Sequence, residues 1–308
     1  MLRLAVVLLI LATPSHANVP RADVPRVVVD IPPIHSLVAQ VMEGVGTPEL
    51  ILPPGLSPHD VALRPSDASA LAQADLVVWI GPELSRAFAR SVDALAQGRV
   101  LGLLEVPDTV LLGYRQGAVF SELGGGDEHD HDHDQGSRDP HAWLDPVNAA
   151  LWLGAIAQAL AQIDPTNAEA YTENAAAAAV RLGTLQGAID TRIIPLRGQP
   201  FVVFHDAYHY FEARFEIEAA GAIALGDGGA PGPRRLVEIG QAAQDLGVTC
   251  VFVEPQFNAG YVGATLPREG ARVGVIDPLG FALTPGPQLY ETLLTGMVAS
   301  FEQCLGAE

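Results

Sequence analysis

Short, continuous runs of apolar residues alternate along the chain with longer segments of helical periodicity. Runs of about four to eight β-branched and aliphatic residues, bounded by proline or glycine, are typical of buried strands. In the first half the pattern predicts strands at residues 26–31, 49–52, 75–80 and 100–103, and helices at 34–44, 66–74 and 82–96. Strands that alternate with helices in this way favour a mostly parallel α/β sheet.

The second half repeats this order of elements. Strands are predicted at residues 200–204, 217–220, 248–253 and 272–276, and helices at 207–215, 233–246 and 288–305. The predicted fold class is therefore α/β, with two similar lobes that each contain a mostly parallel sheet.

The segment between the two halves has a different composition. An apolar helix is predicted at residues 148–163, and residues 166–194 are rich in alanine and contain no proline. As one helix, the second stretch would be roughly 40 Å long and would reach from one lobe to the other. Two ordinary helices inside one lobe are the alternative. The predicted domains are an N-terminal lobe at 18–147, a helical region at 148–195 with an interlobe linker helix at about 166–194, and a C-terminal lobe at 196–308.

Residues 1–17 have the features of an export signal. Arg3 gives a basic start, residues 4–12 are apolar, and Ser15 and Ala17 match the small-x-small pattern of a signal peptidase site. The apolar run is too short for a membrane span, which needs about 20 residues. We therefore expect cleavage after Ala17 and a periplasmic location.

The charge balance argues against one class of partner. The chain has 36 acidic and 17 basic residues, all of the latter arginine, and a formal net charge of −19. Binding to phosphate backbones needs clustered basic residues, so we expect no nucleic-acid partner. An acidic surface is compatible with cationic ligands, although it commonly serves only solubility.

The two cysteines form a disulfide candidate. Cys250 belongs to the strand-like segment 247–253, and Cys304 lies close to the C-terminus. Export to an oxidising compartment favours pairing of an even number of cysteines. The bridge would fix the last helix to the second sheet, and two buried free thiols are the alternative.

One segment has low complexity. Glycines flank the sequence Asp-Glu-His-Asp-His-Asp-His-Asp, which cannot contribute to a core, so residues 124–138 are expected to form a mobile loop. Imidazole and carboxylate are both zinc ligands, which favours loose metal capture over a plain polar insertion. The candidate ligands of this auxiliary, low-affinity site are His129, Asp130, His131, Asp132, His133 and Asp134.

Four further residues follow predicted strands or precede a predicted helix. His205 and Asp277 come directly after strands, and His59 follows a strand by one loop. His141 lies just before the helix that begins near Asp145. Ligands of open α/β sheets bind at the carboxyl ends of the strands, so these side chains are expected to converge. Three imidazoles and one carboxylate would form a tetrahedral zinc site.

One competing motif is the segment His205-Asp206-Ala207-Tyr208-His209. Its two histidines have the spacing of the zinc-protease motif H-E-x-x-H, with Asp in place of Glu. The segment begins where a strand ends, so the two histidines do not share one helical turn, and Asp is one methylene shorter than Glu. The protease interpretation is therefore disfavoured.

Five motifs together resemble the metal-binding solute-binding proteins of ABC importers (the cluster A-I family), and among them the zinc-uptake, ZnuA-type branch. They occur in the family's order and cover the whole chain after the export signal. The motifs are Pro54-Gly55-Leu56-Ser57-Pro58-His59-Asp60, Leu63-Arg64-Pro65-Ser66-Asp67, Asp139-Pro140-His141-Ala142-Trp143-Leu144-Asp145-Pro146, Phe204-His205-Asp206-Ala207-Tyr208 and Val253-Glu254-Pro255-Gln256-Phe257.

The resemblance implies two α/β lobes joined by a long rigid helix, with the metal in the crevice between them. It implies His59, His141 and His205 as ligands, with Asp277 or a water completing the shell. Manganese-type relatives carry Glu where this chain has His205, so the resemblance favours Zn²⁺. The His-rich loop and a disulfide like Cys250–Cys304 are also typical of the zinc branch.

Some residues of the motifs are not expected to bind the metal. Some zinc-type members have an acidic residue directly before the first histidine, where this chain has Pro58, which makes Asp277 the stronger candidate. Asp60, Asp145 and Glu254 are interpreted as residues that orient the ligands or support the structure, as is Arg64.

The resulting hypothesis is a monomeric periplasmic protein that binds Zn²⁺ and passes it to the inner-membrane permease of a zinc importer with its cytoplasmic ATPase. It is not an enzyme on this interpretation. A manganese or iron carrier is one alternative. An exported zinc hydrolase, with Glu254 as general base, is the other, and it would need an open coordination position.

Overall fold

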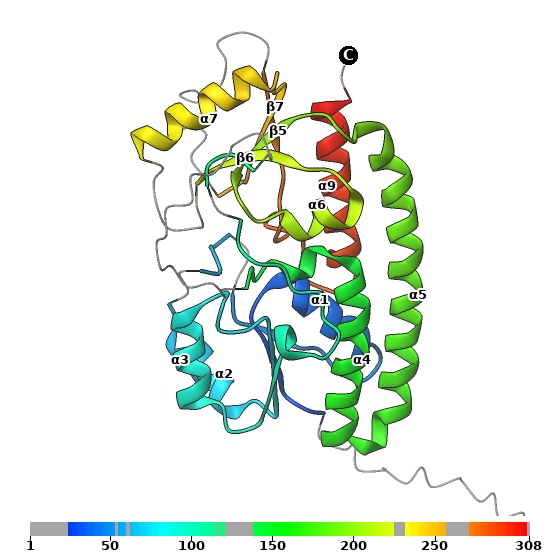
Figure 1. Cartoon of the computed structure of the whole chain (residues 1–308). Coiled ribbons are helices and arrows are strands. Elements are labelled where there is room, and N and C mark those ends of the chain that lie inside the picture. The colour runs from blue at the N-terminus through cyan, green and yellow to red at the C-terminus, as the bar shows by residue number, and fades with distance from the viewer. Residues whose placement is uncertain are drawn as a thin grey trace, which may run out of the picture.

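Two four-stranded parallel sheets form the framework of the molecule (Figure 1). The computed structural model describes residues 24–52, 55–59, 62–115, 117–120, 138–224, 232–256 and 271–306. The first sheet has the order β2-β1-β3-β4 and the second β6-β5-β7-β8. Their strands are β1 (Val27–Val29), β2 (Glu49–Leu50), β3 (Leu76–Trp79), β4 (Arg99–Gly102), β5 (Phe201–His205), β6 (Ala219–Ala224), β7 (Cys250–Val253) and β8 (Arg272–Val275).

Helices connect the strands and cover the sheets, which confirms the predicted α/β class. The α-helices are α1 (Pro32–Val41), α2 (Pro65–Gln73), α3 (Arg86–Leu95), α4 (Pro146–Ile163), α5 (Ala168–Ile193), α6 (His209–Phe215), α7 (Pro233–Asp245) and α9 (Leu289–Leu305). Short 3₁₀ turns lie at Leu103–Glu105, Ala142–Leu144, Pro165–Asn167 and Ile194–Leu196. The lobe boundaries at residues 147 and 195 remain predictions.

The alanine-rich segment is one helix that runs along both lobes. Helix α5 has 26 residues and contacts both α1 and α9 (Figure 1). The Asn174 side chain donates to the carbonyl oxygens of Val41 and Glu43 at the end of α1. Near the other end, Arg192 forms a bidentate ion pair with Glu302 of α9. The helix is therefore tied to both lobes, and the alternative of two helices in one lobe is excluded.

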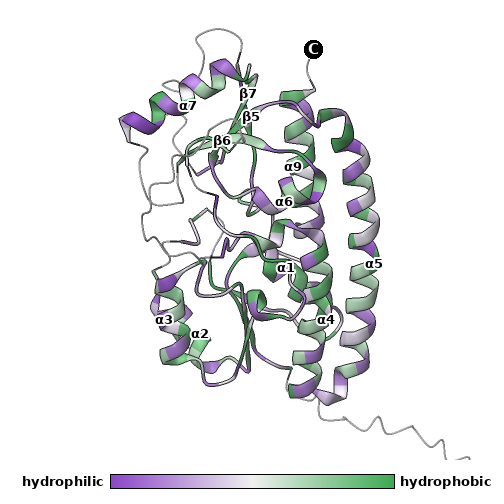
Figure 2. Ribbon diagram, viewed as in Figure 1, coloured by the Kyte–Doolittle hydropathy of each residue, from purple (hydrophilic) through white to green (hydrophobic). Residues whose placement is uncertain are grey.

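The largest hydrophobic core is continuous from one lobe to the other. Trp143, Trp152 and Phe201 are fully buried in one cluster that includes residues of α1, α4, α5 and α9. Figure 2 shows the apolar faces of α4, α5 and α9 turned towards their neighbours. Within the described ranges, α4 is the one helix long and apolar enough to cross a membrane, but half of it is buried inside the fold, as expected of a core helix.

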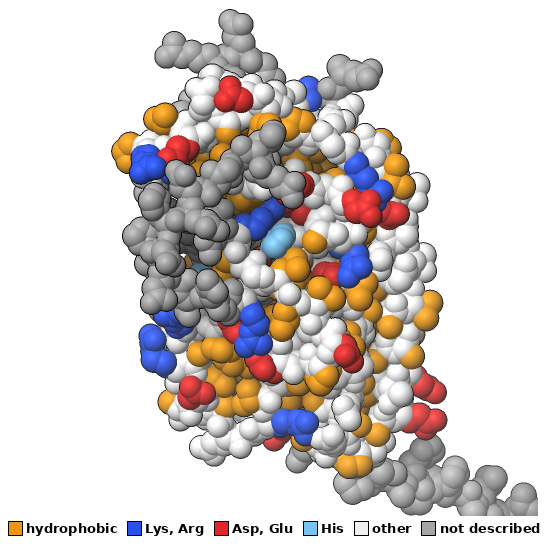
Figure 3. Space-filling model, in the orientation of Figure 1, with side chains coloured by type: hydrophobic (Ala, Val, Ile, Leu, Met, Phe, Trp, Pro, Cys, Tyr) orange, Lys and Arg blue, Asp and Glu red, His pale blue; other side chains and the backbone are white. Residues whose placement is uncertain are grey.

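A disulfide joins Cys250 of β7 to Cys304 of α9, with the two Cα atoms 5.9 Å apart. It fixes the last helix to the second sheet, as the cysteine positions predicted. On the face drawn in Figure 3, arginine and acidic side chains are interspersed over the surface. No large field of one sign appears among the described side chains on that face.

Candidate metal centre

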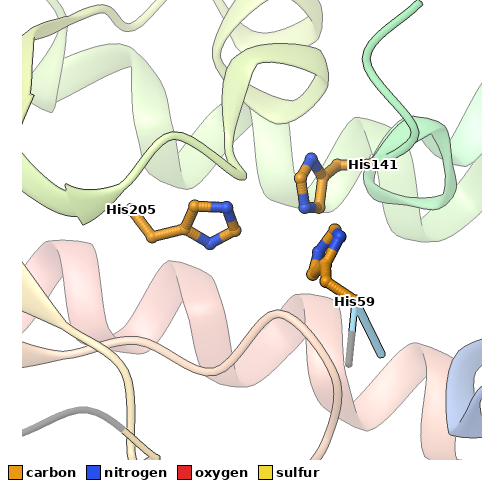
Figure 4. A group of neighbouring side chains, drawn as sticks. All are labelled: His59, His141 and His205. Atoms are coloured by element: carbon orange, nitrogen blue, oxygen red, sulfur yellow. The ribbon is translucent and has the colours of Figure 1, made fainter. Parts of the chain in front are cut away.

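Three histidines from three separate parts of the chain converge where the lobes meet. His59, His141 and His205 each offer a ring nitrogen, and these nitrogens all lie within 4.8 Å of one another. The ring centroids of His141 and His205 are 5.0 Å apart, and those of His59 and His141 are 5.4 Å apart. Figure 4 shows the three rings directed towards a common point. The predicted convergence at the carboxyl ends of the strands therefore holds for these three residues.

His205 is the last residue of β5, an inner strand of the second sheet. Its Nδ1 atom lies 3.2 Å from Oε1 of Glu254, which directly follows the neighbouring strand β7. Glu254 is only 2% exposed and also accepts a hydrogen bond from Gln256. A carboxylate on Nδ1 fixes the proton there and leaves Nε2 as the ligand atom.

His141 has the same arrangement with a different carboxylate. Oδ1 of Asp139 accepts from the His141 backbone N–H at 2.9 Å and lies 2.6 Å from the ring Nδ1. The Nε2 atom of His141 is buried and has no hydrogen-bond partner in the described part of the chain. Buried polar atoms are normally paired. An unpaired nitrogen that faces two other imidazoles is therefore well placed to bind a cation.

His59 lies at the end of the short segment 55–59, in the loop that follows β2. Its ring interacts with the backbone of Leu84, at the entrance to α3. Burial, followed by the proximity of His141 and His205, lowers the pKa of His59 to about 2. Burial likewise holds the pKa of His141 well below 6.5. His59 and His141 are therefore held as neutral imidazoles, the form that binds metals.

The geometry suits a small four-coordinate ion. Around a zinc ion with bonds of about 2.0–2.1 Å, tetrahedral ligand nitrogens are about 3.4 Å apart. The observed separations of up to 4.8 Å need only a small adjustment of the side chains to reach that distance. Three nitrogen donors favour Zn²⁺ over ions that prefer oxygen donors, such as Mg²⁺, Ca²⁺ and Mn²⁺.

Asp277 is not a member of the three-histidine group in this structure. Its Oδ1 atom accepts hydrogen bonds from the backbone N–H groups of Leu279 and Gly280, at 3.0 and 2.9 Å, and Oδ2 accepts from Phe281. These bonds order the turn that follows β8. Its role as fourth ligand stays a prediction, since the carboxylate already satisfies three backbone donors.

The other candidate residues have distinct places. Asp145 accepts from the N–H group of Val147 at the start of α4 and from Arg214, so it supports the structure. Arg64 pairs with Asp67 at the start of α2. Three of the predictions lie outside the described residues. They concern Asp60, the export signal at 1–17 and the six candidate ligands of the His-rich segment.

Sequence reasoning did not single out Asp139. The sequence did contain an indication of its role. An acidic residue two positions before a histidine can reach both the backbone N–H group and the ring of that histidine, as Asp139 does with His141. His209 and His35 lie outside the group: His209 is 3.9 Å from Asp139, and His35 contacts the carbonyl oxygen of Pro48.

This arrangement defines a class: two-lobed solute-binding proteins braced by a long helix, with the ligand held where the lobes meet. The family model ZnuA, described as zinc-uptake complex component A, periplasmic, matches residues 27–304, and the chain belongs to that family.

Two relatives and one solved structure illustrate the similarity. The chain is 39% identical to the high-affinity zinc uptake system protein ZnuA of Paracoccus denitrificans over the full length of both chains. It is 38% identical to the protein of the same name from Brucella abortus, over 91% of each. A crystal structure of a ZnuA superposes with a TM-score of 0.77 at 23% identity, covering 92% of this chain and all of that one, which shows the shared fold.

Proposed function

We propose that this protein binds Zn²⁺ in the periplasm and delivers it to the inner-membrane permease of an ABC importer. The observation that carries the proposal is the buried, unpaired Nε2 of His141, which faces the rings of His59 and His205. The relatives' names, which specify zinc uptake, support the same conclusion. The ion is cargo and undergoes no chemical change.

The proposed ligands are His59, His141 and His205, through Nε2 in the latter two. Asp139 and Glu254 orient two of the rings and increase their basicity, the usual role of carboxylates next to metal-bound histidines. Asp277 or a water molecule would complete a tetrahedral shell. Oδ2 of Asp277 accepts one hydrogen bond, from the Phe281 N–H group, and a carboxylate oxygen has a second lone pair with which it could bind the ion.

Two features favour a carrier over a zinc hydrolase. A hydrolase needs a general base within reach of a metal-bound water. Glu254 was the candidate base, but its two oxygens face His205 and Gln256 and the side chain is buried. The family, a component of zinc uptake complexes, agrees with binding and transport. We therefore propose that the protein is not an enzyme.

The acidic, histidine-rich loop is proposed to bind zinc weakly and to increase its local supply. The residues concerned are His129, Asp130, His131, Asp132, His133 and Asp134. Weak capture by this segment would complement tight binding at the buried site, because its alternating imidazoles and carboxylates are all zinc ligands.

A competition titration of the zinc-free protein with Zn²⁺ tests the proposal. We expect one tight site. Its zinc affinity should fall more than about 100-fold in each of the variants His59→Ala, His141→Ala and His205→Ala. Such a loss exceeds the 10- to 100-fold effect typical of replacing a residue that only orients a ligand. His35→Ala, which removes a histidine outside the cluster, is the matched control and should bind as the unmodified protein does. Absence of a tight site, or tighter binding of Mn²⁺ than of Zn²⁺, would reject the assignment.

A further inference from the structure

The turn that follows β8 forms a fixed support on the second-lobe side of the site. We call residues 277–281 the Asp277 turn, because the Asp277 carboxylate accepts hydrogen bonds from three backbone N–H groups within it. The indole of Trp143 donates to the Pro278 carbonyl at 2.8 Å. Leu279 is 6% exposed and belongs to the continuous core. The backbone of the turn is therefore held by its own carboxylate, by a buried indole and by the core.

The start of α9 holds the same turn from another side. Gly280 has a φ of +73°, and a Cβ atom there would lie 3.2 Å from Cδ2 of Leu289. The Tyr290 N–H group donates to Oγ of Ser36, in α1, at 3.0 Å, and the Ser36 hydroxyl donates to the Pro287 carbonyl at 2.9 Å. The turn thus packs on a helix whose first residues are bonded to the first lobe.

The Phe281 ring reaches from this turn to the first lobe. Residues 55–59, which end in His59, form what we call the His59 loop. A Cβ atom at Gly55 would lie 3.3 Å from Cζ of Phe281, 3.6 Å from Cε2 and 3.8 Å from Cε1. Gly55 also has a φ of +105°, a backbone conformation that favours glycine. The end of the ring therefore lies against the backbone of the loop, at a position where glycine leaves it room.

The first lobe does not fill all the space beside the His59 loop. The His59 N–H group donates to Oγ of Ser57 at 3.3 Å, and the His59 ring interacts with the backbone of Leu84. Pro58 is buried, but it lines a cavity of about 10 Å³ whose other walls are residues of the first lobe. Atoms that border an empty space lose part of their packing contacts. The position of the loop therefore depends also on the contact from the second lobe.

We propose that Phe281 is a positioning residue for the zinc ligand His59, whose loop it supports from the opposite lobe. Because the contact with Gly55 crosses between the lobes, the ring holds His59 towards the ion when the site is closed and releases it when the lobes separate. The Asp277 carboxylate sets the place of the ring, because it holds the Phe281 N–H group. The inference rests on the proposed zinc-binding function and names what keeps one of its ligands in place.

A double-mutant cycle with His59 tests this role. All variants carry alanine at His129, His131 and His133, and Zn²⁺ alone is titrated against chelators. We expect Phe281→Ala to weaken zinc binding about tenfold when His59 is present. In the His59→Ala background there is no ring to position, so the same substitution should change the affinity less than about twofold. Far-ultraviolet circular dichroism checks that each variant is folded.

The matched control and the outcomes separate the two proposals. Leu56→Ala shortens a side chain of the same loop that is 56% exposed, and it should leave the affinity unchanged in both backgrounds. If the chain with His59 and Phe281 intact binds no zinc tightly, the proposed function fails. If that chain binds zinc and Phe281→Ala has no effect, or has equal effects in the two backgrounds, only the positioning role is rejected.

The rate of zinc release gives a second measurement. Stopped-flow mixing of the zinc-loaded protein with excess chelator should show release about tenfold faster in Phe281→Ala, with little change in the association rate, because the ring acts in the closed site. A loss of affinity that came only from slower association would contradict the role.

A second cycle tests the contact itself. Gly55→Ala places a methyl group 3.3 Å from the Phe281 ring, so the loop or the ring must shift and zinc binding should weaken. Part of that loss should disappear in the Phe281→Ala background, where the ring is absent. The strain of a positive φ at residue 55 is present in both backgrounds and cancels in the cycle. Losses that simply add would show that the two residues do not touch and would overturn the proposal.

Discussion

At the scale of single residues, the site depends on two carboxylates as much as on three imidazoles. Asp139 and Glu254 each lie beside the Nδ1 atom of a histidine, so Nε2 is the ring nitrogen that we expect to bind an ion. The histidines could be predicted, because each follows a strand or precedes a helix. The bonds of Asp277 could not, since they depend on the path of the backbone over the next four residues.

We predict that Glu254→Gln weakens zinc binding by about 10- to 100-fold. The amide carries no charge, and its NH₂ group would face the amide donor of Gln256, so the ring of His205 loses its fixed orientation. A chelator competition titration measures the effect. Glu291→Gln removes a carboxylate that pairs with Arg181 away from the site and should leave the affinity unchanged. Unchanged binding in Glu254→Gln would contradict the assigned role.

The pH dependence of binding follows from the lowered pKa values of two ligands. Three histidines with ordinary pKa values near 6.5 would lose about 30-fold in zinc affinity between pH 7 and pH 6, because protons compete for the nitrogens. The pKa of His59 is lowered to about 2 and that of His141 is lowered well below 6.5, so both stay neutral over this range. Lowered values mean weaker proton competition, and the predicted loss of affinity is well below 30-fold.

Zinc affinities at pH 7 and pH 6 measure this directly. In the zinc-free protein, the ring carbon-bound protons of His59 and His141 should show no titration by NMR between pH 7.5 and 5. A midpoint near 6.5 for either ring would show that burial does not hold these groups neutral.

At the scale of elements, the alternation of strands and helices was predictable, and the ends of the elements were less so. The helix predicted at 34–44 begins two residues earlier, because Pro32 and Pro33 form the first turn of α1. Proline is tolerated there because the first N–H groups of a helix have no partner within the helix. The alanine-rich stretch became α5 with short 3₁₀ turns at both ends. The contacts of residues 110–115 and 138–145 with the second lobe were not predicted, because their partners lie 71 to 147 residues away in the sequence and these segments have no regular periodicity.

We predict that Gly221→Ala breaks the contact between β6 and residues 118–120, which form an antiparallel bridge at Val119 and Gly221. The new methyl group would meet the Ala118 carbonyl at 2.2 Å and Ile239 at 2.9 Å, and overpacking of this kind costs about 1–3 kcal/mol. Urea unfolding of the zinc-free protein measures the loss. Gly183→Ala in α5 is the matched control, because its methyl group meets nothing within 4 Å and should stabilise the helix slightly. Equal stability of the two variants would argue against the close contact.

The disulfide gives a second prediction at this scale. Cys250 and Cys304 are 54 residues apart, and opening a bridge over such a loop lowers the free energy of unfolding by about 2–4 kcal/mol. Urea unfolding of the Cys250→Ala, Cys304→Ala double variant checks this value. A double variant as stable as the unmodified protein would show that α9 is held by its apolar contacts alone.

At the scale of the whole molecule, one continuous core and a helix tied to both lobes favour small movements over wide opening. The predicted linker helix is present, and its bonds to α1 and to α9 limit the lobes to a modest separation. The large negative charge was a weak guide to function. Five of the 36 acidic residues fall within residues 127–134, so part of the charge belongs to one loop rather than to the surface as a whole.

Zinc should therefore change stability more than shape. An ion that binds only the folded protein raises its free energy of unfolding by about 4 kcal/mol when its free concentration is 1,000 times the dissociation constant. We expect a clear rise in melting temperature with zinc and little change in the radius of gyration by X-ray scattering. A large contraction on zinc binding would contradict the role of α5 as a rigid brace.

Diffraction from zinc-loaded crystals, recorded on both sides of the zinc absorption edge, tests the central claim most directly. The account predicts one strong anomalous peak about 2.0–2.1 Å from Nε2 of His141, Nε2 of His205 and a ring nitrogen of His59. The same map shows whether Asp277 or a water occupies the fourth position. A zinc ion bound tightly elsewhere, with these three rings unliganded, would contradict the account.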